Sequence, residues 1–319
     1  MNLSLIITVY NEEANLALLF DEINLAMAPI PRTWEVIFVD DGSTDKSLEV
    51  LRQLAEKDPA HVRVVVFRRN FGQTAAITAG FDYSEGEIII LMDADLQNDP
   101  ADIPLLLAKL DEGFDMVSGW RKIRKDNAIT RTLPSVIANG LISWVTGVHL
   151  HDYGCSLKAY RREALEGFRL YGEMHRFIPV FAHSIGASIT EIPVQHHPRR
   201  FGKAHYGLDR TLKVVLDLLT VKFLLNYSIK PMRLFGGTGL ALILASFLVL
   251  IYLFIRRIFQ NIAVFDSPLF LLAIMTLILG FQSMLRGLMA ELLARTYHES
   301  QQKRTYTVRE TILKKSADD

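Results

Sequence analysis

Two uncharged stretches near the end of the chain constrain its fold more than any other feature of the sequence. Residues 234–255 form a run of 22 residues without a charge, bracketed by Arg233 and Arg256, and residues 267–285 form a second run of 19. At ~1.5 Å per residue the first run would be about 33 Å long as a helix, enough to cross a hydrocarbon core of roughly 30 Å. We therefore predict a transmembrane hairpin with spans at about 234–255 and 267–288. A pair of buried core helices is the alternative.

Basic residues flank the two predicted spans unequally. One side carries Lys230, Arg233, Arg286, Arg295, Lys303 and Arg304, and the other carries Arg256 and Arg257. Because basic residues favour the cytoplasmic side of a membrane, we expect both termini in the cytoplasm and the hairpin in the plasma (inner) membrane. The expected division is a cytosolic domain over residues 1–228, a hairpin over 229–290 and a cytosolic tail over 291–319.

Outside the hairpin the chain has the composition of a soluble protein. Half of all residues are apolar and 22% are charged, which excludes global disorder. The 35 basic residues balance 35 acidic ones, so we expect no nucleic acid as a partner. A single cysteine, Cys155, excludes an internal disulfide and a cysteine-rich metal site.

Short apolar runs alternate with helix-like stretches through the first 120 residues. We predict strands at residues 3–9, 34–40, 62–67, 87–93 and 115–119, and helices at 13–27, 45–57, 74–84 and 101–112. This alternation predicts an α/β fold, in which helices cover both faces of a mostly parallel sheet. Polar residues follow four of the strands, so we expect a binding cleft beyond their carboxyl ends.

Two later segments, residues 133–148 and 208–227, are apolar with scattered polar side chains. We expect amphipathic helices that lie at the membrane surface. The alternative is that each helix covers the core of the soluble domain.

The strongest chemical motif is Asp93-Ala94-Asp95, which directly follows a continuously apolar strand. Two carboxylates this close repel one another unless a cation or a hydrogen-bond network neutralises them. Hard divalent ions take oxygen ligands and leave positions open for substrate phosphates. We therefore predict a Mg²⁺ or Mn²⁺ site at Asp93 and Asp95, with Gln97 as a further ligand, directly or through water.

A second acidic motif, Asp40-Asp41-Gly42-Ser43-Thr44-Asp45, reads as a strand end, a tight turn and a helix start. Ser43 or Thr44 could cap that helix, but capping does not explain the paired acids. A carboxylate at a strand end can accept a hydrogen bond from a ribose hydroxyl or a base N–H. The sequence has neither a G-x-G-x-x-G after the first strand nor a P-loop lysine, which disfavours dinucleotide and P-loop folds.

In this order, the two acidic motifs resemble those of family 2 glycosyltransferases with a GT-A fold. The opening Ile7-Thr8-Val9-Tyr10-Asn11-Glu12-Glu13 resembles that family's usual start, and residues 67–73 resemble a segment of the polyprenyl-phosphate sugar transferases, a group that includes dolichol-phosphate mannose synthase. Residues 151–162 and 196–203 resemble the bactoprenol glucosyltransferases, which also carry two C-terminal spans. The resemblance covers nearly the whole chain.

The resemblance implies roles for particular residues. The nucleotide would be held by Thr8, Tyr10, Glu12, Asp40, Asp41, Arg68, Gln73, Asp93 and Ala94. The catalytic residues would be Asp93, Asp95, Asp152 and Arg121, with Asp152 either a base or a residue that positions substrate; a turn cap before Gly154 is its structural alternative.

The acceptor phosphate would be bound by Arg121, Arg131, Arg199, Arg200 and Lys203, since guanidinium groups match phosphate in bidentate geometry. A solvated basic face is the alternative for any one of them. His196, His197 and His205 are expected to be structural or phosphate-facing and not a metal cluster.

The expected reaction is an inverting, metal-dependent transfer of a sugar to a polyprenyl phosphate. Glucose from UDP-glucose is the expected donor, with UDP-GlcNAc, GDP-mannose or a UDP-aminoarabinose derivative as alternatives. A nucleotide-sugar-sensing membrane scaffold without turnover is the non-enzymatic alternative. The expected partners are the nucleotide sugar, the lipid phosphate and the bilayer, and assembly into a homo-oligomer is left open.

Overall fold

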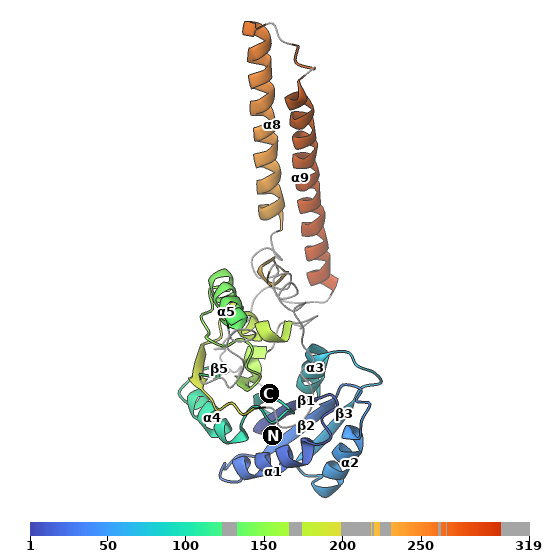
Figure 1. Ribbon diagram of the computed structural model, residues 1–319, viewed down its shortest axis with the longest axis vertical. Helices are drawn as coiled ribbons and strands as arrows, with labels where there is room; N and C mark the ends of the chain where they lie inside the picture. Colours follow the sequence, from blue (N-terminus) through green and yellow to red (C-terminus); the bar gives the residue numbers. More distant parts are fainter. Residues whose placement is uncertain are drawn as a thin grey trace, which may run out of the picture. The chain divides into compact units, whose positions relative to one another are not determined.

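The computed structural model describes residues 1–122, 133–165, 174–198, 218, 220–223, 231–260, 263–265 and 267–300. The chain divides into two compact units, Met1–Val221 and Lys222–Asp319. The first unit is built on a sheet and the second on a pair of long helices (Figure 1).

The sheet of the first unit has seven strands in the order β3-β2-β1-β4-β6-β5-β7. The strands are β1 (Leu3–Val9), β2 (Trp34–Asp40), β3 (Val62–Val66), β4 (Ile88–Asp93), β5 (Met116–Trp120), β6 (Lys158–Arg161) and β7 (Ile189–Pro193). β1, β2, β3 and β4 pair in parallel, and β5 pairs in parallel with β7. β6 lies antiparallel between β4 and β5.

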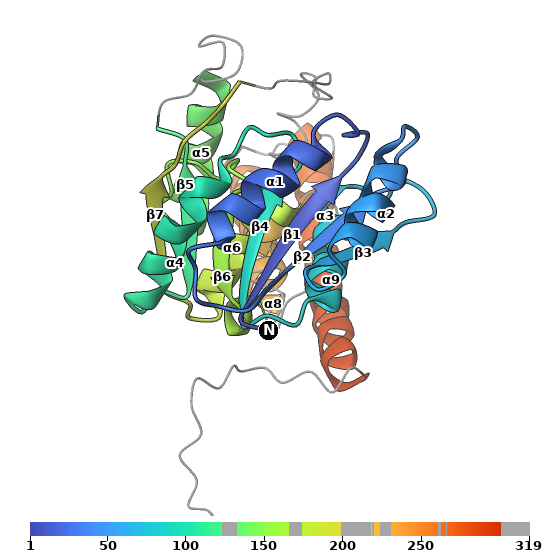
Figure 2. The ribbon, with the colours of Figure 1, turned by 90° about the horizontal axis from the view of Figure 1, so that it is seen from below.

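Helices cover both faces of this sheet (Figure 2). The helical elements of the unit are α1 (Leu16–Met27), α2 (Ser47–Lys57), α3 (Gln73–Tyr83), η1 (Pro100–Asp102), α4 (Ile103–Asp111), α5 (Leu133–Thr146), η3 (Arg162–Leu165), η4 (Met174–Phe177) and α6 (Ile178–Ser184). α1, α2 and α4 share one apolar core with the strands. α3 packs against β1 and β2 on the other face, where Gly80 lets the helix approach Ile6.

The α/β prediction is confirmed: the five predicted strands all form, with ends within one residue of those expected. Apolar residues at helical spacing explain α1, which buries Leu16, Leu19, Phe20, Ile23 and Met27. β6 and β7 were not predicted from the sequence. β6 has only four residues, Lys-Ala-Tyr-Arg, and its pattern predicts no strand by itself.

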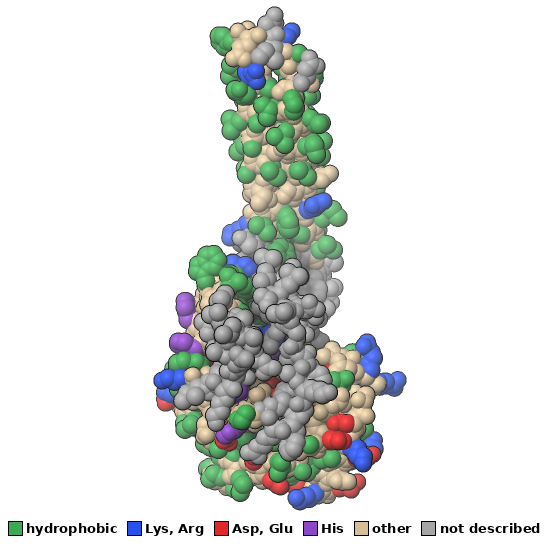
Figure 3. Space-filling view, viewed as in Figure 1, with side chains coloured by type: hydrophobic (Ala, Val, Ile, Leu, Met, Phe, Trp, Pro, Cys, Tyr) green, Lys and Arg blue, Asp and Glu red, His purple; other side chains and the backbone are tan. Residues whose placement is uncertain are grey.

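The second unit contains α8 (Met232–Gln260) and α9 (Pro268–Ser300), which run side by side as a hairpin in Figure 1. Both helices are long and apolar enough to cross a membrane: an 18-residue stretch within Met232–Gln260 has a mean hydropathy of 2.6, and one within Pro268–Leu293 has a mean hydropathy of 2.0. Hydrophobic side chains cover the visible face of the hairpin (Figure 3). This agrees with the predicted two-helix hairpin, although α9 continues past Arg286 as one helix.

Small residues line the contact between α8 and α9. A methyl group at Gly239 would lie 2.6 Å from the carbonyl oxygen of Gly280, so the two backbones nearly touch. Ser246 Oγ donates to the Ala273 carbonyl at 2.7 Å, and Ser283 Oγ donates to the Phe235 carbonyl at 2.8 Å. Close backbone approach and hydroxyl bonds of this kind hold helices together in lipid, where apolar side chains gain little from burial.

Candidate active site

The carboxyl ends of β1, β2 and β4 lie side by side at one edge of the sheet. Thr8 pairs with Asp93 across the β1–β4 ladder, and Val9 pairs with Asp40 across the β1–β2 ladder. The candidate side chains of the first 100 residues therefore meet at the edge where ligands bind in open α/β sheets.

The turn after β2 is fixed by backbone contacts. Gly42 has a φ of 70°, and a Cβ there would lie 2.4 Å from the carbonyl carbon of Arg69, so only glycine fits. Ser43 and Thr44 do not cap α2, which begins at Ser47. They bond instead to Asn11 at the end of β1: Asn11 N donates to Ser43 Oγ at 2.9 Å, and Thr44 N donates to Asn11 Oδ1 at 2.7 Å.

The two acids of this turn have different surroundings. Asp41 is buried, and its carboxylate accepts from Phe71 N at 2.7 Å and Gly72 N at 2.9 Å. Burial raises the pKa of Asp41, and these two backbone bonds oppose the shift. Asp40 is also buried and accepts from Ser43 N at 3.2 Å. Asp41 therefore holds the loop that carries Arg68 to Gln73, and Asp40 closes the turn.

The other candidate nucleotide-binding residues differ in how far their side chains are exposed to solvent. Tyr10 and Arg68 are exposed, as expected for side chains that contact a ligand. Glu12 is half-buried, and its backbone N–H donates to Ser47 Oγ at 2.9 Å. Gln73, at the start of α3, donates from Nε2 to Asp93 Oδ1 at 2.7 Å. Gln73 therefore reaches the acidic pair itself.

Asp95 lies close enough to Asp93 for its negative charge to affect the ionisation of Asp93. Burial, and secondly the negative charge of Asp95, raise the pKa of Asp93 to about 6. A bond from Ser156 and the charges of Arg121 and Lys158 oppose this rise. Asp95 is buried, and its Oδ1 accepts from Gln97 N at 3.1 Å. Two carboxylates that repel one another in this way provide the negative charge that a divalent cation neutralises.

The loop that carries the pair supplies few strong metal ligands. Among the described residues, no group of three or more His, Cys, Asp or Glu side chains is arranged to hold a metal ion. Asp93, Asp95 and the half-buried Gln97 fit an ion such as Mg²⁺ that keeps water and substrate phosphates as its other ligands. Leu96, between Asp95 and Gln97, has a φ of 58°, a strained value for such a side chain, and strained backbone of this kind clusters at functional sites.

At the end of β5, Arg121 and Asp152 form a bidentate ion pair. Arg121 Nε donates to Asp152 Oδ2 at 2.7 Å, and its NH2 group donates to Oδ1 at 3.0 Å. The side chain of Asp152 is fully buried and that of Arg121 is 17% exposed. Asp152 Oδ1 also accepts from Gly154 N at 3.1 Å. These two residues had separate roles in the prediction from sequence, but the structure joins them.

Lys158, in β6, was not identified as a candidate from sequence. It is only 4% exposed, and its Nζ donates to the carbonyls of Tyr153 and Cys155. Burial lowers the pKa of its ammonium group, and the charges of Asp152 and Asp93 are among the effects that oppose this. A lysine between the apolar residues Leu157 and Ala159 was the signal that could have revealed it.

Ser156 and Asn98 join the two sides of the site. Asn98 Nδ2 donates to Ser156 Oγ at 2.7 Å, which connects the loop after Asp95 to the segment between Asp152 and Lys158. Cys155 is a buried free thiol in this segment. The metal-site candidates and the Arg121–Asp152 pair thus belong to one connected arrangement.

A comparison with protein-family models matches residues 4–168, just over half of the chain, to "Glycosyl transferase family 2". The chain belongs to glycosyl transferase family 2. This family 2 glycosyltransferase is 42% identical over 313 residues to the dodecaprenyl-phosphate galacturonate synthase of Rhizobium johnstonii, covering 97% of this chain and 93% of the relative. It is 39% identical to the undecaprenyl-phosphate 4-deoxy-4-formamido-L-arabinose transferase of Pseudomonas paraeruginosa, covering 93% of this chain and 86% of the relative.

Solved structures share the fold. Glucosyl-3-phosphoglycerate synthase from Mycobacterium tuberculosis, in complex with Mn²⁺, UDP and phosphoglyceric acid, superposes with a TM-score of 0.54 at 20% identity. The alignment covers 72% of this family 2 glycosyltransferase and 81% of that chain. The sheet architecture of the first unit is therefore one seen in experimentally determined glycosyltransferase structures.

Four predicted acceptor ligands fall outside the described residues: Arg131, Arg199, Arg200 and Lys203. His205 and most of the predicted helix at 208–227 fall outside them as well; Leu218 and residues 220–223 are described and helical. His196 is buried and pairs with Asn98 in an isolated bridge, and His197 Nε2 lies 3.0 Å from Asp99 Oδ2.

Proposed function

We propose that this glycosyltransferase transfers a sugar from a uridine diphosphate sugar to a polyprenyl phosphate in the membrane, with inversion at the anomeric carbon. The observation that carries the proposal is the 42% identity, over nearly the full length of both chains, to a dodecaprenyl-phosphate galacturonate synthase. The acidic pair at the end of β4 and the arginine at the end of β5 supply the charges that such a reaction needs.

In the proposed reaction, an oxygen of the lipid phosphate forms a bond to the anomeric carbon as the bond from that carbon to the diphosphate oxygen breaks. The electron pair of the broken bond leaves with the nucleoside diphosphate. A divalent cation, held by Asp93 and Asp95 with Gln97, would stabilise the charge that develops on this leaving group. Gln73 holds Asp93 Oδ1 at 2.7 Å and so fixes the orientation of this ligand.

No strong base is needed, because the lipid phosphate is already an anion at neutral pH. This agrees with the surroundings of Asp152, whose fully buried carboxylate accepts from Arg121 and from Gly154 N. We propose that Asp152 orients the guanidinium of Arg121 toward the acceptor phosphate and does not remove a proton. Arg131, Arg199, Arg200 and Lys203 are proposed as further phosphate ligands.

The donor sugar is the least constrained part of the proposal. Glucose was expected from sequence, but the two relatives above carry galacturonate and 4-deoxy-4-formamido-L-arabinose in their names. We therefore propose UDP-linked galacturonate and the formamido-arabinose as the first donors to test, ahead of UDP-glucose. UDP-GlcNAc and GDP-mannose complete the set.

We propose that the hairpin of α8 and α9 anchors the enzyme in the inner membrane with its catalytic unit in the cytoplasm. α5 supports a further contact with the bilayer surface. Its Trp144 is 82% exposed and Leu141, one turn earlier, is 38% exposed. Tryptophan is favoured where a protein meets the membrane–water interface. In vesicles containing a brominated lipid, we expect Trp144→Phe to remove a quenched component of the fluorescence, and no loss of quenching would contradict this contact.

The full-length protein in nanodiscs with undecaprenyl phosphate provides the test of the reaction. Each radiolabelled nucleotide sugar is supplied with Mg²⁺ or Mn²⁺, and the label in the organic phase is measured. We expect one donor to give lipid-linked sugar, and Asp95→Asn to give at least a hundredfold less of it. If the protein binds a nucleotide sugar but transfers no label from any donor, the result would favour the non-enzymatic alternative, a membrane scaffold that senses nucleotide sugars without turnover.

A further inference from the structure

Two consecutive residues at the end of β5 pair with two consecutive residues that follow α5. Trp120 stacks on the imidazole of His151, with the ring centroids 4.3 Å apart and the planes at 21°. The next residue, Arg121, forms the bidentate ion pair with Asp152. The stack and the ion pair therefore join the same two stretches of backbone, one residue apart.

Glu191, in β7, holds His151 in this position. Its Oε2 accepts from His151 N at 2.9 Å, and its Oε1 contacts the imidazole Nδ1. Because an ionised carboxylate only accepts hydrogen bonds, Nδ1 donates in this contact. From α5, Asn139 Nδ2 donates to the His151 carbonyl at 2.8 Å. We call Trp120, His151 and Glu191 the His151 clamp; it joins β5 and β7 to the segment that carries Asp152.

The position of His151 matters for Arg121 because a guanidinium group is planar. Nε and NH2 of Arg121 both bond to the carboxylate of Asp152, so the place of that carboxylate fixes the plane of the guanidinium. The side chain of Asp152 is fully buried, and it follows any shift of its own backbone. His151 is the peptide neighbour of Asp152. A displaced His151 would therefore turn the guanidinium of Arg121.

The same arrangement occurs a second time in the molecule. Trp34 stacks on His61 with the ring centroids 4.2 Å apart and the planes at 19°. His61 also directs both its backbone N–H and its Nδ1 to one carboxylate, that of Asp58, at 3.2 Å and 3.0 Å. The histidine in each case is partly exposed, with 38% of the His61 side chain and 66% of the His151 side chain open to solvent.

The two arrangements differ in their place in the fold. Trp34 begins β2 and His61 directly precedes β3, so this copy lies where the strands begin. Trp120 ends β5, which runs in the same direction as β4, so the His151 clamp lies at the carboxyl ends of the strands, where ligands bind in open α/β sheets. Asp58 is three residues from His61, whereas Glu191 is 40 residues from His151. The His61 copy is thus a local feature and provides a matched control.

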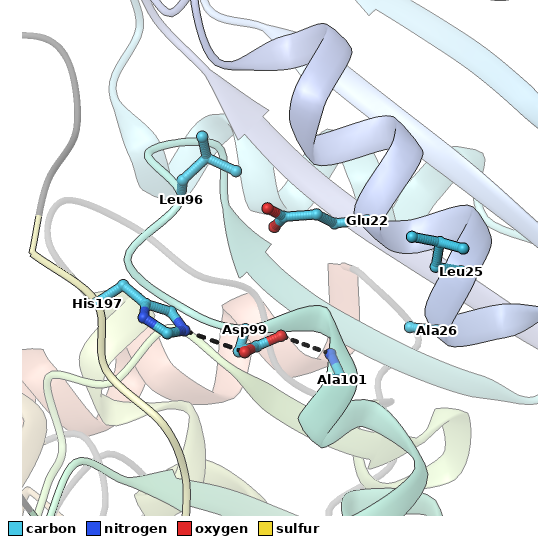
Figure 4. A pocket seen from close by; sticks show the side chains of 7 residues that line it. All are labelled: Glu22, Leu25, Ala26, Leu96, Asp99, Ala101 and His197. Atoms are coloured by element: carbon cyan, nitrogen blue, oxygen red, sulfur yellow. Dashed lines mark hydrogen bonds and ion pairs between the residues drawn. The ribbon is translucent and has the colours of Figure 1, made fainter.

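The contact between His197 and Asp99 is built differently. His197 uses Nε2, at 3.0 Å from Asp99 Oδ2, and its backbone N–H donates to the Gln97 carbonyl at 2.9 Å. Asp99 Oδ1 accepts from Ala101 N at 2.9 Å, so this carboxylate also caps η1. Figure 4 shows both contacts of Asp99 beside a hollow of about 380 Å³ between α1 and the loop after β4. A histidine near a carboxylate therefore does not by itself produce the arrangement around His151.

We propose that His151 and Glu191 are positioning residues for the lipid phosphate: by holding His151 against Trp120, Glu191 fixes the direction in which the Arg121–Asp152 pair presents its guanidinium. The inference rests on the proposed function, in which Arg121 binds the acceptor phosphate. It assigns no part of the clamp to the metal or to the nucleotide. The candidate metal ligand Asp93 has a support of its own, the bond from Gln73 at 2.7 Å.

The test uses the full-length enzyme in nanodiscs with undecaprenyl phosphate and compares variants of His151 and Glu191. His151→Ala removes the ring and its bond. His151→Phe keeps a ring to stack on Trp120, and His151→Asn keeps an amide near the position of Nδ1. Glu191→Gln keeps the shape of the side chain and loses its charge. His61→Ala is the matched control.

We expect His151→Ala to raise the KM for undecaprenyl phosphate about three- to tenfold, the effect of losing one partly exposed charge-assisted bond. His151→Phe, His151→Asn and Glu191→Gln should each give a smaller rise, because each keeps one of the contacts. The donor KM, and the affinity for UDP with Mg²⁺ measured by isothermal titration, should stay within about twofold of the wild type. His61→Ala should leave all these values unchanged, although both alanine variants should lower the melting temperature to a similar extent.

A double-variant experiment separates positioning from a merely structural role. Arg121→Lys keeps a positive charge beside Asp152 but loses the planar, bidentate group that the clamp directs. If the clamp acts through that group, adding His151→Ala to Arg121→Lys should raise the acceptor KM by less than about twofold more. Adding His61→Ala to Arg121→Lys should have no effect on the acceptor KM.

Four results would overturn the inference: unchanged acceptor kinetics in His151→Ala, an equal loss in donor KM or UDP binding, an equal acceptor effect in His61→Ala, or a full additional loss in the Arg121→Lys background. Should His151→Ala fail to fold, Glu191→Gln and His151→Phe are judged by the same criteria. A wild-type protein that transfers no sugar from any donor would overturn the proposed function and the inference with it. An active wild type beside an equally active His151→Ala overturns the inference alone.

Discussion

The two halves of the sheet relate to the sequence in different ways. In the half made of β3, β2, β1 and β4, all pairings are parallel. The helix between two successive strands brings the chain back to the edge of the sheet where each strand begins. In the half made of β6, β5 and β7, β6 pairs antiparallel with β5, and these two strands come from segments about 40 residues apart in the sequence. The first half follows from the repeated alternation of strand and helix along the chain. The second half forms through pairing between strands that are distant in the sequence.

The same difference separates the two sides of the candidate site. On the proposed nucleotide side, side chains such as Asp41 and Asn11 mainly bind backbone groups and so shape loops. On the proposed acceptor side, charged side chains pair with one another, as Arg121 does with Asp152. The four predictions below test whether this division holds, from the largest expected effect to the smallest.

The largest effect is expected at the junction of the two halves, from Asp95→Asn. Losing one of two carboxylate ligands should lower kcat about 10²–10³-fold or more, while thermal unfolding stays near that of the wild type. Turnover across a Mg²⁺ and Mn²⁺ titration measures the effect, and EDTA should abolish wild-type activity. Asp111→Asn is a suitable control, because Asp111 is an exposed acid that pairs with Arg32. Normal turnover with ordinary metal dependence in Asp95→Asn would remove Asp95 from the metal site.

On the acceptor side, Arg121→Ala should affect both stability and catalysis. It leaves the carboxylate of Asp152 buried and unpaired, which typically costs about 3–5 kcal/mol of unfolding free energy. Adding Asp152→Asn should recover much of that stability without restoring the KM for the lipid phosphate. Chemical unfolding and steady-state kinetics of the single and double variants measure the two effects. If only the donor KM rises, Arg121 binds the diphosphate and not the lipid.

A smaller loss is expected from Lys158→Met, which keeps the length of the side chain but removes its charge. The carbonyls of Tyr153 and Cys155 lose their donor, so the turn that carries Asp152 should be held less firmly. We expect kcat to fall about tenfold, as for other groups that orient a catalytic residue, with UDP affinity unchanged. Isothermal titration with UDP and Mg²⁺ provides the second measurement. A loss of UDP binding equal to the loss of kcat would place Lys158 on the nucleotide side.

The smallest effect is expected on the nucleotide side, from Asp41→Asn. Asparagine keeps one oxygen for the two N–H donors of Phe71 and Gly72 and loses the other, so the loop should loosen but still form. UDP affinity should fall about three- to fivefold, with no change in the KM for the lipid phosphate. An effect on the acceptor alone would show that the two sides are not divided as described.

The features predicted from sequence belong mostly to the parallel half of the sheet, and the features missed belong to the other half. The runs at 3–9 and 34–40 match β1 and β2 at both ends, because a buried parallel strand is continuously apolar and ends in polar residues. The Asp93 and Asp95 pair was found because it follows such a strand. β6 was missed because its four residues become a strand only between β4 and β5. The pairing of Arg121 with Asp152, 31 residues apart, was missed for the same reason.

The glycine contact in the hairpin has a consequence for how this protein can vary. α8 and α9 hold one another through Gly239, Gly280 and a few hydroxyl bonds on their inner side. Exposed residues such as Leu248 and Phe281 take no part in that contact. The outward side chains can therefore be exchanged to suit a thicker, thinner or more fluid bilayer while the pairing of the two helices stays the same. The proposed anchor can therefore adapt to the lipid composition of the membrane independently of the proposed chemistry at Asp93 and Arg121.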